Sequence, residues 1–426
     1  MKKLISLFLV CITSVVLFIG CGEKNNVSDN IVNISILNSK NEIEPELNEL
    51  INEFTKENKD INIKVIKIGQ TGKYKEKLDS MYQLGNAPTM FLIDTSNIDS
   101  YKENCLDLSK EQWIKDISGE VSDIVKTDDG KVVGFPFATE GIGFIYNKKV
   151  LNEAGVDAKK INTISALKEA FEKIEAIGKK GIIVTNEDWS LGDHFSATYY
   201  AVEKEELNNK SSEYFKSLKY KDLKNNKVLN GLIDTFDLMK QYNIYSDNPL
   251  LPTYSKGTEL FFEGNIGFWY MGNWVSQEIL KNNSGNYEFG FIPVPISNNP
   301  SDYGNNEIAL GVTKYILVDD KNSSEAQKEA AKKFLNYLVY NKTGNEFLLN
   351  KARVIPAFSN LDVNSEDPLT KDIIKYRNAN KTMELMNSYL PLDNSKVIGE
   401  GFRRYLNNEI NREELISIIQ TFWSKY

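Results

Sequence analysis

The sequence predicts an α/β protein of two domains, in which helices cover parallel strands. Three observations lead to this prediction. After an apolar start, strand-like and helix-like patterns alternate, which is typical of a parallel sheet with crossover helices. The chain has 426 residues, which is long for a single hydrophobic core. Hydrophobic residues make up 41% of it and aromatic residues 11%, enough apolar material for globular cores.

The N-terminal twenty residues have the pattern of a targeting signal. Lys2 and Lys3 precede an apolar run over residues 4–19, which ends at Gly20. The run is too short and wrongly flanked for a membrane span. We therefore expect residues 1–20 to be a signal peptide.

The end of this run, Phe18-Ile19-Gly20-Cys21, resembles a bacterial lipobox, with Phe18 in place of the usual leucine. The resemblance implies a diacylglyceryl group on Cys21 and cleavage just before it. Two acyl chains suffice for stable anchoring, and residues 21–30 would form a lipidated, flexible tether. We therefore expect an extracytoplasmic protein anchored to the cell membrane through Cys21. An ordinary secretory signal with an incidental cysteine is the alternative.

Charge and composition exclude several classes of protein. The net charge of −8 gives no electrostatic case for a nucleic-acid partner. Of three cysteines, Cys11 would leave with the signal and Cys21 would carry lipid, so Cys105 stands alone and no disulfide framework is expected. The single histidine excludes His-rich zinc motifs, and we expect neither a metal nor a cofactor.

The first half of the mature chain alternates strands and helices. Strands are expected at 31–38, 61–69 and 89–94, and helices at 41–60 and 74–84. In such folds, functional groups gather in the loops at the carboxyl ends of the strands. That rule points to Asn38, Ser39 and Lys40 after the first strand, and to Asp94 and Thr95 after the third.

The second half begins with a β-rich passage over 130–149, and we expect the chain to cross to a second lobe at the break at Pro136. The polar loop 297–306 is a candidate second crossing, and 352–358 a third. A helix capped near Thr163 is also expected. The spacing of a serine and a glutamine at 324 and 327 predicts a capping box before another helix.

Five segments carry a resemblance to a known family: GNAPTMFLID, FPFATEGIGFIYNKKVL, FFEGNIGFWYMGNW, FGFIPVPI and ARVIPAF. In this order, behind a lipobox, they resemble the family 1 extracellular solute-binding proteins, the ligand-capturing lipoproteins of bacterial sugar-importing ABC transporters. The resemblance implies a periplasmic-binding-protein-like fold. Two α/β lobes would be joined by a hinge of three crossovers and would close on a ligand in the cleft between them.

Lobe 1 would then comprise residues 31–135 and 310–352, and lobe 2 residues 136–309 and 353–426. The function implied is capture of a carbohydrate, more specifically an oligosaccharide, and its delivery to the permease subunits of an ABC importer. We expect a monomer that does no chemistry on the sugar.

The resemblance also implies ligand contacts. In maltose-type members the glutamate of the segment matching ATEG touches sugar, and that position here is Glu140. The tryptophan of a Gly-Pro-Trp motif stacks on a sugar ring and corresponds to Trp274, although this chain has Asn273 in place of the proline. Contacts after the first and third strands correspond loosely to residues 38–40 and 94–96. The alternative for Trp274 is a core tryptophan at a helix start.

Residues 186–195 concentrate polar and aromatic groups, Asp188, Trp189, Asp193 and His194, and this segment is predicted to face the cleft, with Asp188, Trp189 and His194 as ligand contacts. The alternative is a core Trp189, a surface Asp188 and a structural His194. Arg353 is predicted either to clamp a sugar hydroxyl or to pair with a carboxylate between the lobes. Aromatic faces and hydrogen-bonding side chains suit a pyranose, which has apolar C–H patches and a rim of hydroxyls.

Two other classes of function are open. An anchored glycoside hydrolase would use Glu140 and Asp188 as an acid and base pair, and a binding protein could take a non-sugar solute such as an organophosphate or polyamine. The chain has no nucleophile elbow, and GQTGK at 69–73 is too compact for a Walker A loop. An anionic ligand would need clustered arginines, for which only Arg353 is a candidate. Sugar capture is therefore favoured.

Overall fold

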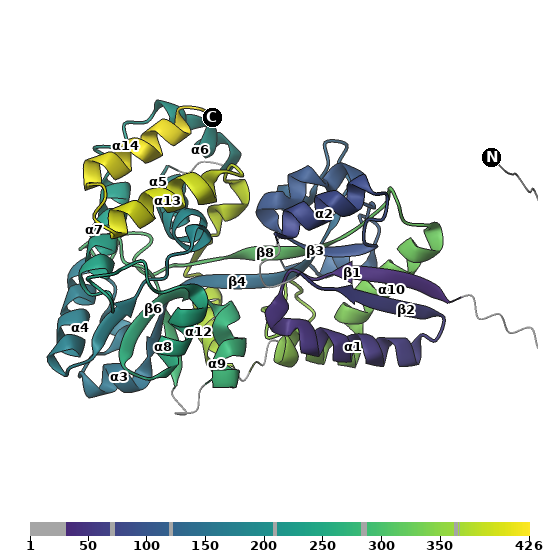
Figure 1. Cartoon of the computed structure of the whole chain (residues 1–426), viewed down its shortest axis with the longest axis horizontal. Helices are drawn as coiled ribbons and strands as arrows, with labels where there is room; N and C mark the ends of the chain where they lie inside the picture. Colours follow the sequence, from purple (N-terminus) through teal and green to yellow (C-terminus); the bar gives the residue numbers. More distant parts are fainter. Residues whose placement is uncertain are drawn as a thin grey trace, which may run out of the picture.

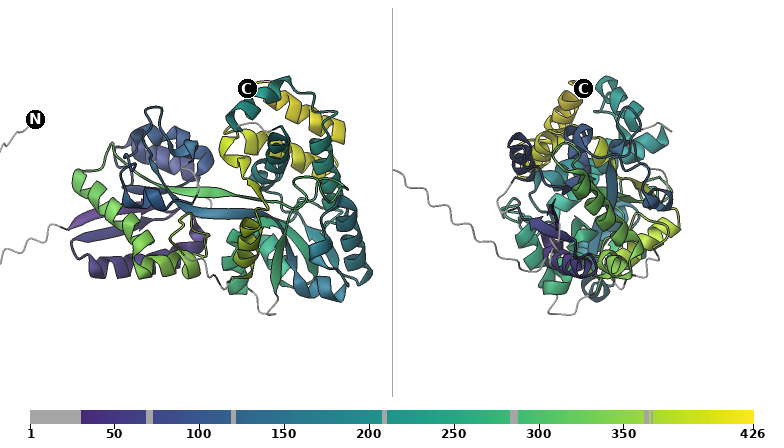
Figure 2. Two further views of the ribbon diagram at one scale, coloured as in Figure 1. Left: turned by 180° about the vertical axis from the view of Figure 1, so that it is seen from behind. Right: turned by 90° about the vertical axis from the view of Figure 1, so that its right-hand side faces the viewer.

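We analysed a computed structural model of the chain. It describes residues 31–68, 73–118, 122–207, 211–282, 288–361, 365 and 367–426. The predicted signal peptide and tether, with Cys21, lie outside the described residues. The chain forms two lobes side by side, and two long strands, β4 and β8, run from one lobe to the other (Figure 1). The view from behind shows the same two bodies joined by these strands (Figure 2).

Within the described residues, nine strands form one mixed sheet in the order β2-β1-β3-β8-β4-β6-β5, with β7 paired to β4 and β9 to β8. Strand β1 pairs in parallel with both β2 and β3, whereas β8 is antiparallel to β3 and β4. The strands are β1 (Val32–Leu37), β2 (Ile61–Ile66), β3 (Met90–Asp94), β4 (Gly134–Asn147), β5 (Lys180–Ile183), β6 (Ile266–Gly272), β7 (Phe289–Ile292), β8 (Ile308–Val318) and β9 (Thr382–Glu384).

Helices cover the sheet in both lobes (Figure 1). They are α1 (Glu44–Glu57), α2 (Tyr74–Gln83), α3 (Lys148–Glu153), α4 (Ile164–Ala176), α5 (Ser196–Glu206), α6 (Ser211–Ser217), α7 (Lys227–Gln241), α8 (Tyr254–Phe262), α9 (Ser276–Asn282), α10 (Glu325–Tyr340), α11 (Lys342–Glu346), α12 (Pro368–Asn378), α13 (Asn394–Leu406) and α14 (Arg412–Trp423). None of the helices in the described ranges is long and apolar enough to cross a membrane.

The predicted alternation in the first lobe is confirmed as β1, α1, β2, α2 and β3. Helix α1 buries one face, from which Phe54 packs edge-on against Phe334 and Tyr337 of α10. Two predicted helix starts are also confirmed. The Thr163 hydroxyl accepts a hydrogen bond from the backbone N–H of Ala166, and a capping box begins α10. Local sequence therefore accounts well for these elements.

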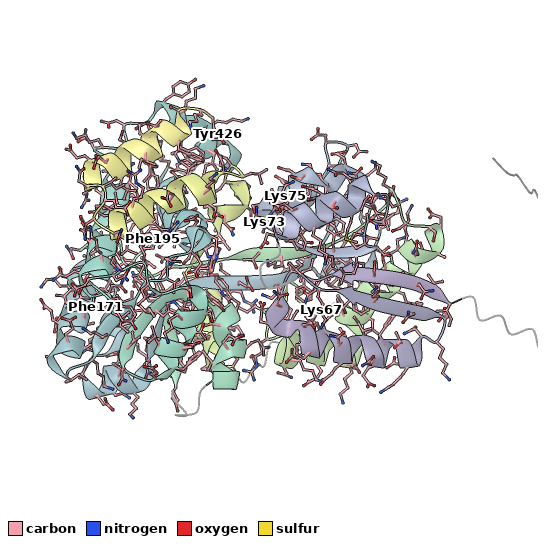
Figure 3. All side chains as sticks on the ribbon, in the orientation of Figure 1. Lys67, Lys73, Lys75, Phe171, Phe195 and Tyr426 are labelled. Carbon is pink, nitrogen blue, oxygen red and sulfur yellow. The ribbon has the colours of Figure 1, made fainter. Side chains whose placement is uncertain are left out.

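Separate hydrophobic cores define the two lobes. Trp113, Phe135 and Phe334 belong to the core of the first lobe. Phe171 and Phe195 belong to that of the second, where Figure 3 labels them.

The first two crossings lie within strands. In β4, Phe135 packs in the first core and Phe144 in the second, and β8 runs antiparallel beside it. The break at Pro136 is only a shift of register within β4. The candidate crossing at 297–306 is wrong, because this loop folds back within the second lobe, where the Asn305 side chain accepts a hydrogen bond from the N–H of Ile296. The second crossing is β8 itself.

The third crossing extends further than 352–358. Val354, Phe358 and Leu361 still pack in the first core, whereas Ile355, Leu369 and Ile373 pack in a further cluster of the second lobe. The packing therefore places residues 353–361 largely with the first lobe, later than the expected boundary at Arg353. The other expected lobe bounds stay predictions.

Candidate ligand-binding site

A cleft of about 700 Å³ lies between the lobes beside the crossing strands. Its described lining comes from three sources. The first lobe contributes residues 39–42 and 94–97; β4 and β8 contribute Glu140, Thr313 and Lys314; and the second lobe contributes Trp189, Asp193, His194, Tyr254, Trp274, Glu278 and Asn387. Of the predicted contacts, Ser39, Lys40, Asp94, Thr95, Glu140, Trp189, His194 and Trp274 thus lie together in one cleft.

Asn38 does not line the cleft but shapes the turn that does. Its Oδ1 accepts a hydrogen bond from the backbone N–H of Lys40 at 3.0 Å, and its Nδ2 donates to the Lys40 carbonyl at 2.8 Å. Asparagine commonly closes turns through such local bonds. The side chain is buried, so we assign Asn38 a positioning role in place of the predicted contact.

A buried ion pair joins the first lobe to β4. Lys40 Nζ lies 2.7 Å from Glu140 Oε1 and 2.8 Å from Glu42 Oε1, and the Thr313 hydroxyl donates to Glu140 Oε2 at 2.5 Å. Burial alone would lower the pKa of Lys40, but the two carboxylates outweigh it and raise the pKa. Lys40 is therefore an ammonium ion, and both Glu140 oxygens have protein partners.

Asp94, at the end of β3, makes the second ion pair of the cleft. Lys314 Nζ donates to Asp94 Oδ1 at 2.5 Å, and 46% of the Asp94 side chain remains exposed. The neighbouring Thr95 hydroxyl donates to the carbonyls of Val312 and Thr313 at 3.1 and 2.9 Å. Thr95 therefore ties the first lobe to β8, whereas Asp94 stays open to the cleft.

Aromatic rings form the wall on the second lobe. Trp189 and His194 come from η7, a short π-helix (Trp189–Phe195), and Trp274 from the turn η9 (Asn273–Val275). The Trp189 ring lies 5.3 Å from His194 and 6.0 Å from Trp274, between centroids, and Tyr254 completes the wall at 6.1 Å from Trp189. Rings at these separations present large, rigid apolar faces.

The turn before Trp274 is held differently from a Gly-Pro-Trp turn. Asn273 Oδ1 accepts a hydrogen bond from the N–H of Gly141 on β4 at 2.9 Å. A side chain at Gly272 would occupy the space of the Trp274 ring, so only glycine fits there. Asn273 thus fixes the turn by a hydrogen bond where proline would fix it by its ring.

Helix α13 holds η7 in place. Asn394 Nδ2 donates to the Gly192 carbonyl at 2.8 Å and to Asp193 Oδ1 at 3.0 Å. Burial raises the pKa of Asp193 to about 6, against the effect of its hydrogen bonds. Burial also lowers the pKa of His194 to about 4, with Asp94 opposing and Lys314 adding to the shift. At neutral pH, His194 is therefore uncharged.

Two predicted contacts lie elsewhere. Asp188 does not line the cleft, because its carboxylate pairs with Arg403 of α13 at 3.2 Å. Arg353 does not line the cleft itself but a small adjoining cavity, which shares Lys40, Glu42, Glu140 and Trp274 with it. Its guanidinium lies 3.7 Å from the buried carboxylate of Asp367, which agrees with the predicted pairing with a carboxylate. The proposed acid and base pair of Glu140 and Asp188 therefore does not meet in the cleft.

Ser96 and Asp193, which lie in the two segments predicted to face the cleft, also line it, whereas sequence reasoning did not assign several other lining residues: Asn41, Glu42, Asn97, Tyr254, Glu278, Thr313, Lys314 and Asn387. A signal existed for Thr313 and Lys314, which interrupt an otherwise apolar strand. Tyr254 and Asn387 reach the cleft through the tertiary fold, and nothing in their local sequence marks them. Among the described residues, no group of three His, Cys, Asp or Glu side chains could hold a metal ion.

Two further aromatic side chains and the free cysteine lie outside the cleft lining. Trp269 is fully buried, and Tyr146 packs against Phe268 with ring centroids 6.4 Å apart, away from the cleft lining. Cys105 is a buried free thiol.

Two α/β lobes, strands that cross between them, and a polar and aromatic cleft at the crossing define a two-lobed binding protein of the periplasmic-binding-protein type. The chain belongs to the bacterial extracellular solute-binding protein family, whose family model matches residues 49–375.

A relative and two solved structures are similar to this chain. The melibiose/raffinose/stachyose-binding protein MelE of Bacillus subtilis (strain 168) is 24% identical over 301 residues, which span 67% of this chain and 64% of MelE. RafE in complex with raffinose has a TM-score of 0.76 at 17% identity, covering 92% of this chain and 99% of that chain. A sugar transporter protein of Bacillus licheniformis in complex with stachyose has a TM-score of 0.68 at 19% identity, covering 92% of this chain and 100% of that chain. The two structures establish the shared fold.

Proposed function

We propose that this protein captures an oligosaccharide outside the cytoplasm and delivers it to the membrane subunits of an ABC importer. The observation that carries the proposal is the pairing of an aromatic wall on the second lobe with hydrogen-bonding groups on the first lobe and the crossing strands. A pyranose needs both, because it has flat C–H patches and a rim of hydroxyls.

The size of the cleft and the comparisons support an oligosaccharide. A cleft of about 700 Å³ falls within the range of small-molecule sites. A relative is named as a binder of melibiose, raffinose and stachyose, and two proteins of the same fold hold raffinose and stachyose. We propose Ser39, Asp94, Trp189, Asp193, His194 and Trp274 as its contacts, with Lys40 and Glu140 forming the floor.

Capture would proceed by closure of the lobes. The ligand first meets one lobe, and bending of β4 and β8 brings the other lobe onto it. We propose that no covalent chemistry follows, because both Glu140 oxygens have protein partners and Asp188 lies outside the cleft.

We also propose that the mature chain is a lipoprotein that works as a monomer. The lipobox resemblance at Cys21 supports a lipid anchor, with residues 22–30 as a tether. A Cys21→Ser variant expressed in its host should be released from membranes, as fractionation and immunoblotting would detect. Retention of this variant in the membrane fraction would contradict the anchor.

A thermal-shift panel tests the sugar proposal. Residues 22–426 would be heated with mono- and oligosaccharides, since a ligand that binds only the native state raises the melting temperature. Calorimetry would then measure the affinity of each hit. We expect tri- and tetrasaccharides to give the largest shifts. Absence of any shift with sugars, or release of reducing ends from the ligand, would overturn the proposal.

A further inference from the structure

We propose that the cleft rejects anionic saccharides, and that Asp94 and Asp193 are the residues that make this selection. The inference rests on the proposed function, since it names the charge class of the saccharide taken by that same cleft. The expected order of affinity is an amino-bearing or neutral saccharide first and an acidic one, such as a uronate, last.

The two lysines of the described cleft lining are each paired with protein carboxylates. Within the described lining, Lys40 pairs with Glu140 and Glu42, and Lys314 pairs with Asp94. Only 5% of the Lys40 side chain and 15% of the Lys314 side chain are exposed. An anionic ligand would have to compete with a protein carboxylate for either ammonium.

Cations near the cleft are also paired. Lys73 and Lys75 lie at the start of α2, on the side of the first lobe that faces the second (Figure 3), and they pair with Glu76 and Asp79. Arg353 lies near Asp367, outside the cleft lining. None of these three side chains belongs to the described lining of the cleft, so none of them stands ready there for a carboxylate or phosphate.

The carboxylates, in contrast, come from both lobes. Asp94 stands at the end of β3 in the first lobe, and Asp193 in η7 of the second. Lys314 Nζ donates to Asp94 Oδ1, whereas the Asp193 carboxylate accepts hydrogen bonds from Asn394 Nδ2 and from the side chain of Ser395. Asp94 and Asp193 both line the cleft, and burial, with smaller effects of the Asp94 and Asp188 charges, raises the pKa of Asp193.

Closure of the lobes makes the cleft selective for the charge of the ligand. A ligand carboxylate held between the lobes would lie near the carboxylate of Asp193 and that of Asp94, which Lys314 already pairs, in a dehydrated site where Coulomb repulsion is much stronger than in water. A hydroxyl or ammonium group would instead donate to the carboxylates, and bonds to an ionised acceptor are the stronger kind. The cleft therefore discriminates by the sign of the ligand charge.

Calorimetry with a matched set of ligands tests the inference. The set is raffinose, or the neutral sugar that gives the largest thermal shift, together with its mono-oxidised uronate derivatives and its mono-aminated derivatives at the same primary carbons. We expect uronates to bind at least tenfold more weakly than the neutral sugar, and amino derivatives to bind within threefold of it or more tightly. Uronate binding within threefold of neutral would overturn the inference alone.

Equal losses of affinity for the uronate and amino derivatives would indicate a steric effect and would also overturn the inference. If no saccharide of any charge bound, the proposed function itself would fail, and the inference with it. The two failures are thus distinguishable.

Variants of Asp94 and Asp193 then test whether these two residues cause the selection against anionic saccharides. In Asp94→Asn, Lys314 loses its partner, and in Asp193→Asn, the second lobe loses its carboxylate. For both we expect the neutral-to-uronate affinity ratio to fall at least fivefold.

Asp188→Asn is the matched control, because it removes the same charge five residues from Asp193 but outside the cleft lining. An equal fall in the control would assign the effect to general charge and overturn the roles of Asp94 and Asp193. Thermal unfolding would verify that each variant is folded. If one of the two cleft variants does not fold, the other still tests the inference.

Discussion

At the scale of single residues, the aromatic wall should dominate affinity for a sugar. Trp274 presents its ring beside Trp189 and His194, so Trp274→Ala should weaken binding by at least about 1 kcal/mol through lost stacking. Calorimetry with the ligand from the sugar panel would measure the change. Tyr220→Ala, which removes an aromatic ring that is 80% exposed and absent from the cleft lining, serves as control. Unchanged affinity in Trp274→Ala would remove Trp274 from the proposed site.

The single histidine of the chain is a built-in probe of the cleft. Its pKa is lowered to about 4 in the folded state, below the usual 6.5. The unfolded chain thus takes up a proton that the folded chain refuses, and His194 should reduce stability as the pH falls from about 6.5 toward 4. The His194→Gln variant should lack this pH-dependent loss of stability. Urea unfolding of both proteins at pH 7 and pH 5 would measure the difference.

Nuclear magnetic resonance of the lone imidazole gives an independent measurement. A titration midpoint near 6.5 would contradict the burial of His194. Asp193 acts in the opposite sense, since its pKa is raised to about 6 and its protonation favours the folded state as the pH falls from about 6 toward 4. The comparison of wild type with His194→Gln separates the two effects, because Asp193 is present in both.

Among individual residues, chain position alone was enough to place several side chains in the cleft lining, while their contact with a ligand stays a prediction. Ser39, Lys40, Asp94 and Thr95 follow parallel strands, whose carboxyl ends meet at one edge of the sheet. Asp188 was wrong because the direction of a side chain on η7 depends on its packing against α13, where Arg403 lies. That packing joins segments about two hundred residues apart, and no local pattern reveals it.

At the scale of elements, the turn after β1 is the one most open to test. Asn38 holds the backbone of Lys40 through two hydrogen bonds, so Asn38→Ala should destabilise the protein by about 1–3 kcal/mol, the usual effect of leaving buried polar groups unpaired. It should also weaken ligand binding, because Lys40 and its carboxylate partners would shift. Chemical unfolding and calorimetry would measure both effects.

A matched control lies on the same strand. Asn33 is exposed, and Asn33→Ala should leave both stability and binding nearly unchanged. Equal behaviour of the two variants would show that the turn after β1 does not position Lys40.

Sequence patterns located the helices and strands better than the junctions between lobes. A proline and a polar loop are ordinary signs of a chain break, and both suggested crossings. The crossings β4 and β8 are instead continuous paired strands whose apolar residues enter first one core and then the other. Because the alternation of a strand looks the same in either core, the point of passage between lobes depends on the tertiary fold.

For the whole molecule, the two-lobed arrangement predicts a change of shape on binding. Closure about β4 and β8 should bring the lobes together and reduce the radius of gyration of residues 22–426 when the ligand is added. Small-angle X-ray scattering with and without a saturating sugar would detect this, and a sugar that fails the thermal-shift panel is the control. An unchanged radius with bound ligand would contradict closure.

The pairing of β3 with β8 also has a consequence for folding. Asp94 and Lys314 are partners in that ladder, yet they are 220 positions apart, and the first core further needs residues up to Leu361. The first lobe cannot complete its core until most of the chain has been synthesised, so its folding must wait for segments that follow the larger part of the second lobe in sequence. Contacts of such long range slow folding, and the two lobes should unfold in one cooperative transition.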